Sequence, residues 1–362
     1  MVTEQAVLAA LSTVNDPDLH RDLVSLGMVK DVRVEGSDVS FEVVLTTPAC
    51  PLKARIEQDC RAALSKIPGI GGIRLKFGAR VAPARGMASP NGIPGVKNII
   101  AVASGKGGVG KSTVSVNLAV ALAESGAAVG LLDADIYGPS IPLMMGIRGM
   151  PEIGADRRIV PPEAHGVKLM SLGFLLPDTD TPVIWRGPMI GKALNQFLRE
   201  VQWGELDYLL IDLPPGTGDA QLTLSQTLAM SGALIVTTPQ DVAMTIASRV
   251  LLMFRKMQVP ILGIVENMST FLCPTCHKET AIFSQGGGRK ASQEMGVPFL
   301  GEIPLDGEIC EGGDDGVPIL LRNSSSPVAE VFRRLAGNLA ARVSVEALGV
   351  AGAAQPLPIV SS

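Results

Sequence analysis

The sequence predicts an α/β fold in which a small α/β domain precedes a doubly wound, mostly parallel sheet. Three observations support this fold class. Short apolar runs alternate with helical stretches after Asn98, a glycine-rich turn joins the first run to its helix, and a stretch rich in Pro and Gly separates residues 1–80 from the rest. Such apolar runs are typical of parallel strands that are covered by helices on both faces.

Length and composition also indicate two folded domains. The chain has 362 residues, of which 46% are hydrophobic and 18% charged, and a domain averages about 150 residues. Its net charge of −4 and its aromatic content of 4% provide no general attraction to nucleic acid or anionic lipid, and few surfaces for stacked bases. We therefore expect no nucleic acid and no membrane among its partners.

The first domain, residues 1–80, has the pattern of a small α/β unit. Two alternating runs are joined by Glu35-Gly36-Ser37-Asp38, which is typical of a hairpin turn. The predicted elements are a helix over Glu4–Leu11, strands over Met28–Val34 and Val39–Leu45, a helix over Leu52–Leu64 and a strand over Ile73–Phe77. Residues 81–96 follow as a flexible linker, because Ala82–Gly95 holds three Pro and three Gly.

Five apolar runs predict the strands of the second domain, which we place at residues 97–345. The runs are Ile99–Ala103, Val129–Leu132, Tyr208–Ile211, Ala233–Thr237 and Ile261–Glu266. A helix over Val114–Ala123 follows the first of them. Residues 346–362 have too little apolar surface to bury, so we expect them to form a flexible tail.

The chain shows no sign of export or membrane insertion. Met1 is not followed by the basic flank and apolar run of an export signal, so we expect a cytoplasmic protein. The uncharged stretch Ala220–Gln240 is about long enough to cross a bilayer, but polar residues interrupt it. Five cysteines form an odd set, and only Cys273 and Cys276 lie close together in the sequence, which suggests metal or redox chemistry rather than a disulfide framework.

The glycine-rich turn matches a phosphate-binding loop. Gly105, Gly110, Lys111 and Ser112 satisfy the eight-residue pattern, in which backbone N–H groups and a helix N-terminus face an anion. Lys111 would neutralise phosphate charge, and the Ser112 hydroxyl would hold Mg²⁺. The predicted nucleotide-binding residues of the turn are Gly105, Lys106, Gly107, Gly108, Val109, Gly110, Lys111, Ser112 and Thr113.

The same turn also fits a dinucleotide-binding pattern. Gly105, Gly107 and Gly110 satisfy G-x-G-x-x-G, and Asp133 lies 23 residues beyond Gly110, where such a fold places its ribose-binding acid. Two lysines in the turn favour a nucleoside triphosphate instead, as does Asp212, which ends an apolar strand and can support the Mg²⁺ shell.

Two carboxylates end the strand after the loop helix, in Leu131-Leu132-Asp133-Ala134-Asp135. A carboxylate at this position can reach the attacking water or the metal shell. We assign Asp135 rather than Asp133 to the nucleotide, and expect Asp133 to cap the strand end.

The lysine at the second position of the loop, Lys106, gives the sequence GKGGVGKST a resemblance to the deviant phosphate loop of the MinD, ParA and nitrogenase iron protein superfamily. Within it, the chain resembles the Mrp/ApbC branch of iron–sulfur cluster carriers. The stretches that carry this resemblance are Asp133–Pro142, Trp185–Gly191, Asp207–Asp219, Thr238–Val242 and Val265–Cys276. Residues 1–80 resemble the small domain found in iron–sulfur assembly factors.

The resemblance implies a function and several site residues. It implies a carrier that binds and slowly hydrolyses ATP, holds a [4Fe–4S] cluster at a homodimer interface and transfers it to apoproteins, with scaffold or recipient proteins as partners. Lys106 would reach the partner subunit's nucleotide. Asn267 would read the adenine base, and Pro239 and Gln240 would line its pocket.

Cys273 and Cys276 have a spacing at which two thiols can ligate one metal centre, but they supply only half of a four-thiolate site. A two-fold dimer would bring a second pair. Three alternatives stay open: a zinc ion bound by the two thiols, with or without His277, a thioredoxin-like redox pair, and buried structural thiols. Cys50 precedes a helix, whose dipole is expected to lower the pKa of its thiol; we read Cys60 as a buried small residue.

Two other functions remain open at this point. A partitioning ATPase that resembles MinD or ParA would need a basic surface or a basic amphipathic C-terminal helix. Glu346 is the single charged residue in Val343–Ser362, which disfavours membrane attachment by that route. A dinucleotide-dependent reductase would be distinguished by testing the binding of NADH against ATP.

Overall fold

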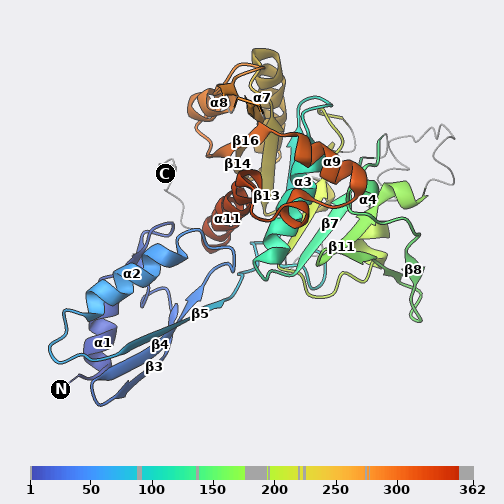
Figure 1. The fold of residues 1–362 in the computed structure, drawn as a ribbon. Coiled ribbons are helices and arrows are strands. Elements are labelled where there is room, and N and C mark those ends of the chain that lie inside the picture. Colours follow the sequence, from blue (N-terminus) through green and yellow to red (C-terminus); the bar gives the residue numbers. More distant parts are fainter. Residues whose placement is uncertain are drawn as a thin grey trace. The chain divides into compact units, whose positions relative to one another are not determined.

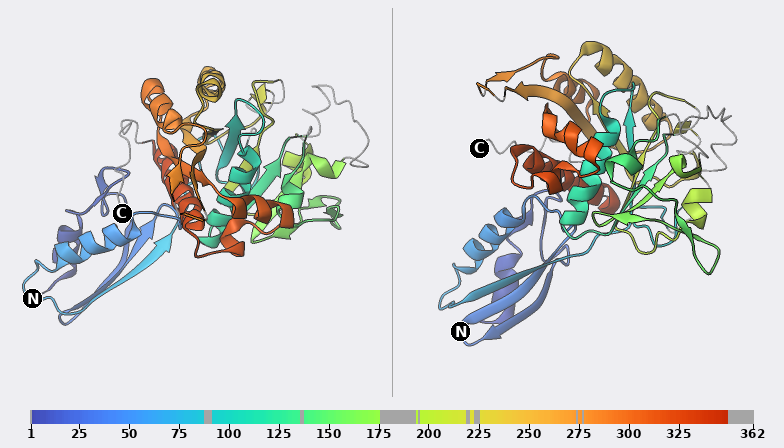
Figure 2. Two further views of the ribbon diagram at one scale, coloured as in Figure 1. Left: turned by 45° about the horizontal axis from the view of Figure 1, so that its top comes forward. Right: turned by 45° about the vertical axis from the view of Figure 1, so that its right-hand side comes forward.

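The structure is a computed structural model in which the chain forms two units (Figures 1 and 2). It describes residues 2–87, 92–135, 138–175, 194, 196–218, 221–222, 226–273, 275–276 and 278–349. Among the described residues, the first unit contains residues 2–82 and 340–349, and the second contains residues 83–339. The last helix therefore belongs to the second unit at its start and to the first unit at its end.

The first unit is a three-stranded sheet with two helices on one face (Figure 1). Its elements are α1 (Glu4–Leu11), β1 (Asn15–Asp16), β2 (Arg21–Asp22), β3 (Val29–Glu35), β4 (Asp38–Leu45), α2 (Lys53–Leu64) and β5 (Ile73–Ala79). The expected hairpin is confirmed, since β3 and β4 pair antiparallel and Gly36 at the turn has a φ of +66°, a conformation that glycine adopts without strain. Alternate residues of β4 are buried against α1 and α2.

One sheet dominates the second unit, and within the described residues it has nine strands. Those strands are β6 (Ile99–Ser104), β7 (Val129–Asp133), β10 (Glu163–Ala164), β11 (Val167–Ser171), β12 (Tyr208–Asp212), β13 (Gly232–Thr237), β14 (Ile261–Leu272), β15 (Glu279–Thr280) and β16 (Phe299–Leu305). Their order is β10-β11-β7-β12-β6-β13-β14-β15, with β16 paired to β14. Only β10 and β15 pair antiparallel, which confirms the predicted parallel α/β sheet.

Helices cover this sheet. They are α3 (Lys111–Glu124), α4 (Ile141–Met144), α7 (Asp241–Lys256), α8 (Gly287–Met295), α9 (Gly307–Asp315), α10 (Ile319–Arg322) and α11 (Pro327–Leu348), with a 3₁₀ turn η1 (Leu172–Leu175) and a separate hairpin of β8 (Glu152–Ile153) and β9 (Ile159–Val160). α3 packs on β7 and β12, whereas α7 packs on β13 beside α8 (Figures 1 and 2). None of the helices in the described ranges combines the length and the apolar character needed to cross a bilayer.

The structure adds strands that the sequence pattern did not reveal. β11 contains Lys168, whose ammonium donates to the carbonyl of Trp203 at 2.8 Å. β16 contains Glu302 and Pro304, and the amide of Asn338 donates to the carbonyl of Leu300 in that strand at 2.9 Å. Charged residues and proline break an apolar run, so neither segment looked like a buried strand.

Two predicted boundaries were wrong. β14 continues to Leu272, beyond the predicted end at Glu266, because the polar residues after Glu266 lie on the strand rather than in a loop. The helix after the phosphate loop begins at Lys111 rather than Val114. The expected linker has ordered contacts in its described part. Ile93 and Val96 are buried, and Val96 forms an isolated parallel β-bridge with Leu206.

Candidate functional site

The phosphate loop lies between the buried strand β6 and helix α3. Gly110 caps the helix in a left-handed conformation with a φ of +78°. A Cβ at this position would stand 2.2 Å from Nδ2 of Asn267, so both the backbone and the space require glycine. Gly105 is equally confined, because a Cβ there would lie 2.7 Å from the backbone nitrogen of Ala247 in α7. The loop is thus held against α7 and β14.

A buried ionic network lies at the start of α3. The Lys111 ammonium is 2.5 Å from Oδ2 of Asp212, and the Ser112 hydroxyl donates to the same oxygen at 2.7 Å. The Ser115 hydroxyl lies 2.6 Å from the other oxygen, Oδ1. Asp212 is fully buried and Lys111 is 6% exposed, so these contacts satisfy a charge pair that would be costly to bury alone.

The strand β7 brings two more carboxylates to the same end of the sheet. Asp133 is buried; it accepts a hydrogen bond from the Ser171 hydroxyl at 2.9 Å and one from the backbone N–H of Asp135 at 3.1 Å. Burial, together with the negative charge of Asp212, raises the pKa of Asp133 to about 7. Asp135 lies 4.0 Å from the Lys111 ammonium. Asp135 therefore faces the loop while Asp133 anchors the end of its strand.

The segment after β12 is tied to the phosphate loop by backbone hydrogen bonds. The N–H of Gly216 donates to the carbonyl of Ser104 at 2.9 Å, and the N–H of Ala134 donates to the carbonyl of Asp212 at the same distance. The carboxyl ends of three neighbouring strands are thus linked, as expected where a doubly wound sheet holds its ligand.

The remaining loop residues are more open. Gly107 and Gly108 are exposed and Lys106 is half-buried. The carbonyl of Lys106 accepts a hydrogen bond from the Ser104 hydroxyl at 3.1 Å. Its side chain has no ion-pair partner within the described ranges.

Asn267 contacts the loop directly. Its Nδ2 donates to the carbonyl of Val109 at 2.9 Å, and the residue is 7% exposed. Pro239 and Gln240 lie at the start of α7, where the Oε1 of Gln240 and the hydroxyl of Thr238 are buried without a hydrogen-bond partner in the described part of the chain. Buried polar atoms without partners indicate a place where a polar ligand can bind.

The cysteine pair lies at the end of a β-hairpin that continues β14. Leu272 pairs with Glu279 of β15, and the N–H of Cys273 donates to the carbonyl of Lys278 at 3.2 Å. Hydrogen bonds from the backbone N–H groups of Cys276 and Thr275 lower the pKa of the Cys273 thiol. This favours the thiolate that binds metals.

The hairpin does not complete a metal site by itself. Cys276 is exposed and Cys273 is partly exposed, and no cluster of three metal-ligating side chains occurs in the described part of the chain. Three large apolar side chains nearby in the sequence are also exposed: Leu272, Ile282 and Phe283.

The expectation for Cys50 was wrong. Burial raises the pKa of its thiol to about 11, because the cost of desolvating a thiolate exceeds the effect of the helix dipole. Cys60 is fully buried as expected, and burial raises the pKa of its thiol to about 12. Cys310 is exposed on α9.

Some predicted motif residues lie outside the described residues: Ile136 and Tyr137, Trp185–Gly191, Asp219 and His277. Two polar residues that contact the acidic groups were missed from the sequence. Ser115 lies four residues after Lys111 on α3, a spacing that puts both side chains on one helix face. Ser171 ends β11, a strand that was itself not predicted.

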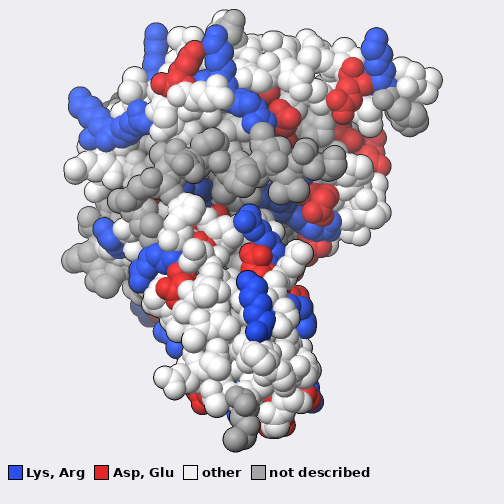
Figure 3. Space-filling view, turned by 90° about the vertical axis from the view of Figure 1, so that its left-hand side faces the viewer, with Lys and Arg blue, Asp and Glu red and all other residues white. Residues whose placement is uncertain are grey.

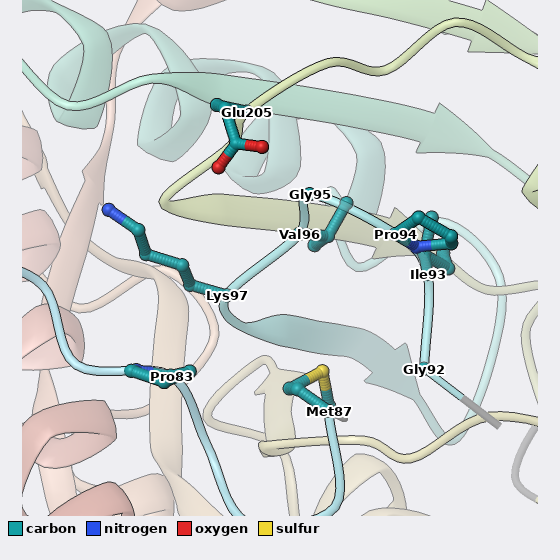
Figure 4. Close-up of a pocket in the computed structure, with 9 residues that line it drawn as sticks. All are labelled: Pro83, Met87, Gly92, Ile93, Pro94, Gly95, Val96, Lys97 and Glu205. Atoms are coloured by element: carbon teal, nitrogen blue, oxygen red, sulfur yellow. The ribbon is translucent and has the colours of Figure 1, made fainter. Parts of the chain in front are cut away.

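A cavity of about 470 Å³ lies at the opposite end of β6 from the phosphate loop. It is lined by Pro83, Met87, Gly92, Ile93, Pro94, Gly95, Val96, Lys97 and Glu205 (Figure 4). Lys97 pairs with Asp207 at 2.8 Å. On the face drawn in Figure 3, Lys and Arg side chains form small patches with Asp and Glu side chains among them.

Comparison with known proteins matches both parts of the chain to families. Residues 95–340 match the family described as NUBPL iron-transfer P-loop NTPase, and residues 4–75 match the iron–sulfur cluster assembly protein family. The iron–sulfur cluster carrier protein of Deinococcus radiodurans is 52% identical over 95% of this chain and 96% of that protein. The iron–sulfur cluster carrier protein of Escherichia coli K12 is 42% identical over 93% of this chain and 91% of that protein.

Solved structures agree in fold. A nucleotide-binding protein from Archaeoglobus fulgidus, in complex with ADP, is 40% identical with a TM-score of 0.57 and covers 65% of this chain and 91% of that one. The cell division ATPase MinD of Pyrococcus furiosus is 25% identical, with a TM-score of 0.51. The match covers 67% of this chain and 97% of that one.

Proposed function

The chain belongs to the iron-transfer P-loop NTPase family, which includes the iron–sulfur cluster carrier proteins, and from this membership we propose a specific activity. It binds and slowly hydrolyses ATP, carries a [4Fe–4S] cluster at a homodimer interface and transfers that cluster to apoproteins in the cytoplasm. One observation carries the proposal: a buried phosphate-loop network and two cysteines, which supply half of a four-thiolate site, lie at strand ends of the same sheet, and the pKa of the Cys273 thiol is lowered.

The loop geometry supports the nucleotide part. Backbone N–H groups at the start of α3 and the ammonium of Lys111 would bind the phosphates. The Oε1 of Gln240, which is buried without a hydrogen-bond partner among the described residues, can accept a hydrogen bond from an adenine amino group, while Pro239 would pack on the base. Asn267, whose Nδ2 contacts the loop carbonyl of Val109, would read the base. The ADP complex of the Archaeoglobus fulgidus protein supports nucleotide binding by this chain.

The oxygens around Asp212 fit a magnesium ion. The Ser112 hydroxyl and the Asp212 carboxylate lie 2.7 Å apart, and hard oxygen ligands suit Mg²⁺. When bound, the ion would neutralise charge on the phosphates. Lys111 would then bind the phosphates while Asp135 orients the water that attacks the γ-phosphorus and breaks its bond to ADP.

The thiols require a second subunit. Cys273 and Cys276 are exposed or partly exposed on a hairpin end, and a four-thiolate cluster needs two more ligands. A two-fold axis supplies them from an identical chain. The same axis would allow Lys106, which has no ion-pair partner in the described ranges, to reach the nucleotide of the partner subunit.

The test is anaerobic reconstitution with iron and sulfide. We expect about four iron atoms per dimer, ATP hydrolysis that Lys111→Ala abolishes, and cluster transfer to an apoprotein. Cys273→Ala should lose the cluster, whereas Cys310→Ala, which changes another exposed thiol, should keep it. A cluster retained by Cys273→Ala, or a loaded monomer, would refute the proposal. One zinc ion in place of iron would also refute it.

A further inference from the structure

The strand β14 connects the two halves of the proposed site. It runs over twelve residues, Ile261–Leu272. Asn267, in its middle, contacts the phosphate loop, and Cys273 follows its last residue. At a rise of about 3.3 Å per residue, the six residue steps from Asn267 to Cys273 span at most about 20 Å. No loop intervenes between the contact of Asn267 with the phosphate loop and the first thiol.

The strand is irregular immediately after Asn267. Met268 has a φ of +59°, a left-handed conformation that is rare for residues other than glycine and asparagine. The pairing of β14 with β16 shifts register between Asn267 and Phe271. Such conformations and bulges persist only where their surroundings hold them, and they concentrate next to functional sites.

Contacts fix the strand on both sides of Met268. The carboxylate of Glu266 accepts hydrogen bonds from the N–H groups of Gly286 at 3.1 Å and Gly288 at 2.5 Å. The Ser269 hydroxyl donates to the carbonyl of Ile303 at 3.1 Å. The methyl group of Met268 lies 3.7 Å from the point where a Cβ on Gly110 would stand. Hydrogen bonds therefore fix the strand both before and after Met268.

We propose that Met268 is a positioning residue whose left-handed backbone directs the Asn267 amide onto the phosphate loop and sets the direction of the strand toward the cysteines. Nucleotide binding and cluster binding then influence each other through this bend. Such coupling is reciprocal, because a change in one affinity requires an equal change in the other. The inference rests on the proposed function and adds to it the element that links the two sites.

Two substitutions separate backbone conformation from side-chain chemistry. Met268→Asn removes the apolar side chain but keeps a residue that tolerates the left-handed region. Met268→Val keeps an apolar side chain but disfavours that region, because valine is β-branched. Circular dichroism shows whether the valine variant folds. If it does not, Met268→Ala replaces it, because alanine disfavours the left-handed conformation less strongly than valine does.

The measurements are the KM for ATP and the rate at which an iron chelator removes the cluster with and without ATP. We expect Met268→Val to raise the KM about tenfold, as the strain of a left-handed residue predicts, and to remove most of the ATP effect on cluster release. Its iron content per dimer should stay unchanged. Met268→Asn should behave as the wild type does.

Each outcome is decisive. A valine variant with the wild-type KM and the wild-type ATP effect would overturn the inference, as would an asparagine variant impaired as much as the valine variant. If the wild type itself holds no iron–sulfur cluster, the proposed function fails instead, and the KM values still decide whether Met268 positions Asn267.

Discussion

Replacing Ser115 by alanine should weaken both stability and ATP hydrolysis. A hydroxyl has one proton to donate, and Ser115 lies closer to Oδ1 of Asp212, at 2.6 Å, than to the carbonyl of Lys111, at 3.1 Å. The variant therefore leaves one oxygen of a fully buried carboxylate without this donor. Hydrogen bonds to charged groups contribute about 1.5–3 kcal/mol, so the free energy of unfolding should fall by about that amount.

The catalytic effect follows from the same contact. In the variant, Asp212 keeps its hydrogen bonds to Lys111 and Ser112, but its carboxylate group can rotate. We therefore expect kcat/KM for ATP to fall about tenfold, which corresponds to about 1.4 kcal/mol of activation free energy. Urea unfolding and a coupled ATPase assay measure the two effects. Ser115→Thr, which restores the hydroxyl, should recover most of both.

A matched control lies on the same helix. The Ser125 hydroxyl donates to the carbonyl of Leu122 at 2.6 Å at the end of α3, so Ser125→Ala removes a bond of equal length to an uncharged acceptor. We expect it to cost about 1 kcal/mol and to leave ATP hydrolysis unchanged. Equal losses in Ser115→Ala and Ser125→Ala would show that the contact with Asp212 has no special role.

Three further predictions concern the loop, the thiols and pH. Gly110→Ala should raise the Kd for ATP at least about tenfold in calorimetric titration, because its φ of +78° and the 2.2 Å approach of Asn267 both oppose a Cβ; unchanged binding would contradict the loop geometry. In the metal-free protein at pH 7.5, iodoacetamide should modify Cys273 long before Cys50, since the pKa of the first thiol is lowered and that of the second is about 11; mass spectrometry gives the order, and equal rates would argue against it. Burial and the charge of Asp16 raise the pKa of Asp18 from 3.8 to about 6. The folded chain therefore binds this proton more tightly, and the stability that it provides, about 1–2 kcal/mol after allowing for solvent, is present below pH 4 and lost as the pH rises through 6. Asp18→Asn should flatten that decline in urea unfolding, and an unaltered pH profile would contradict the shift.

The parts of the fold that follow from local pattern could be predicted from the sequence. β6, β7, β12 and β13 are buried throughout, so their residues are almost uniformly apolar and the runs stand out. β16 has Glu302 and Pro304 because it is paired on one side only in the described part of the sheet. Its pattern depends on neighbours that the sequence does not reveal.

The site divides in the same way. The phosphate-loop residues are adjacent in the sequence, and a motif of that kind can be recognised directly. The contact of Asn267 with Val109 joins residues 158 positions apart, and the bend at Met268 has no signal in residue type, since methionine normally avoids it. The pKa of Cys50 was misjudged because burial, which depends on tertiary packing, outweighs the helix dipole.

The edge strand β16 also limits how this protein can associate with itself. An open strand edge invites another chain to add to the sheet, and proteins avoid this with proline, charge or a covering group. β16 has all three: Pro304 lacks an N–H, Glu302 is charged, and Asn338 occupies the carbonyl of Leu300. Growth of the sheet into fibrils or edge-to-edge dimers is therefore discouraged on this side. The proposed homodimer would then have to form through side-chain contacts, such as those around the thiol hairpin.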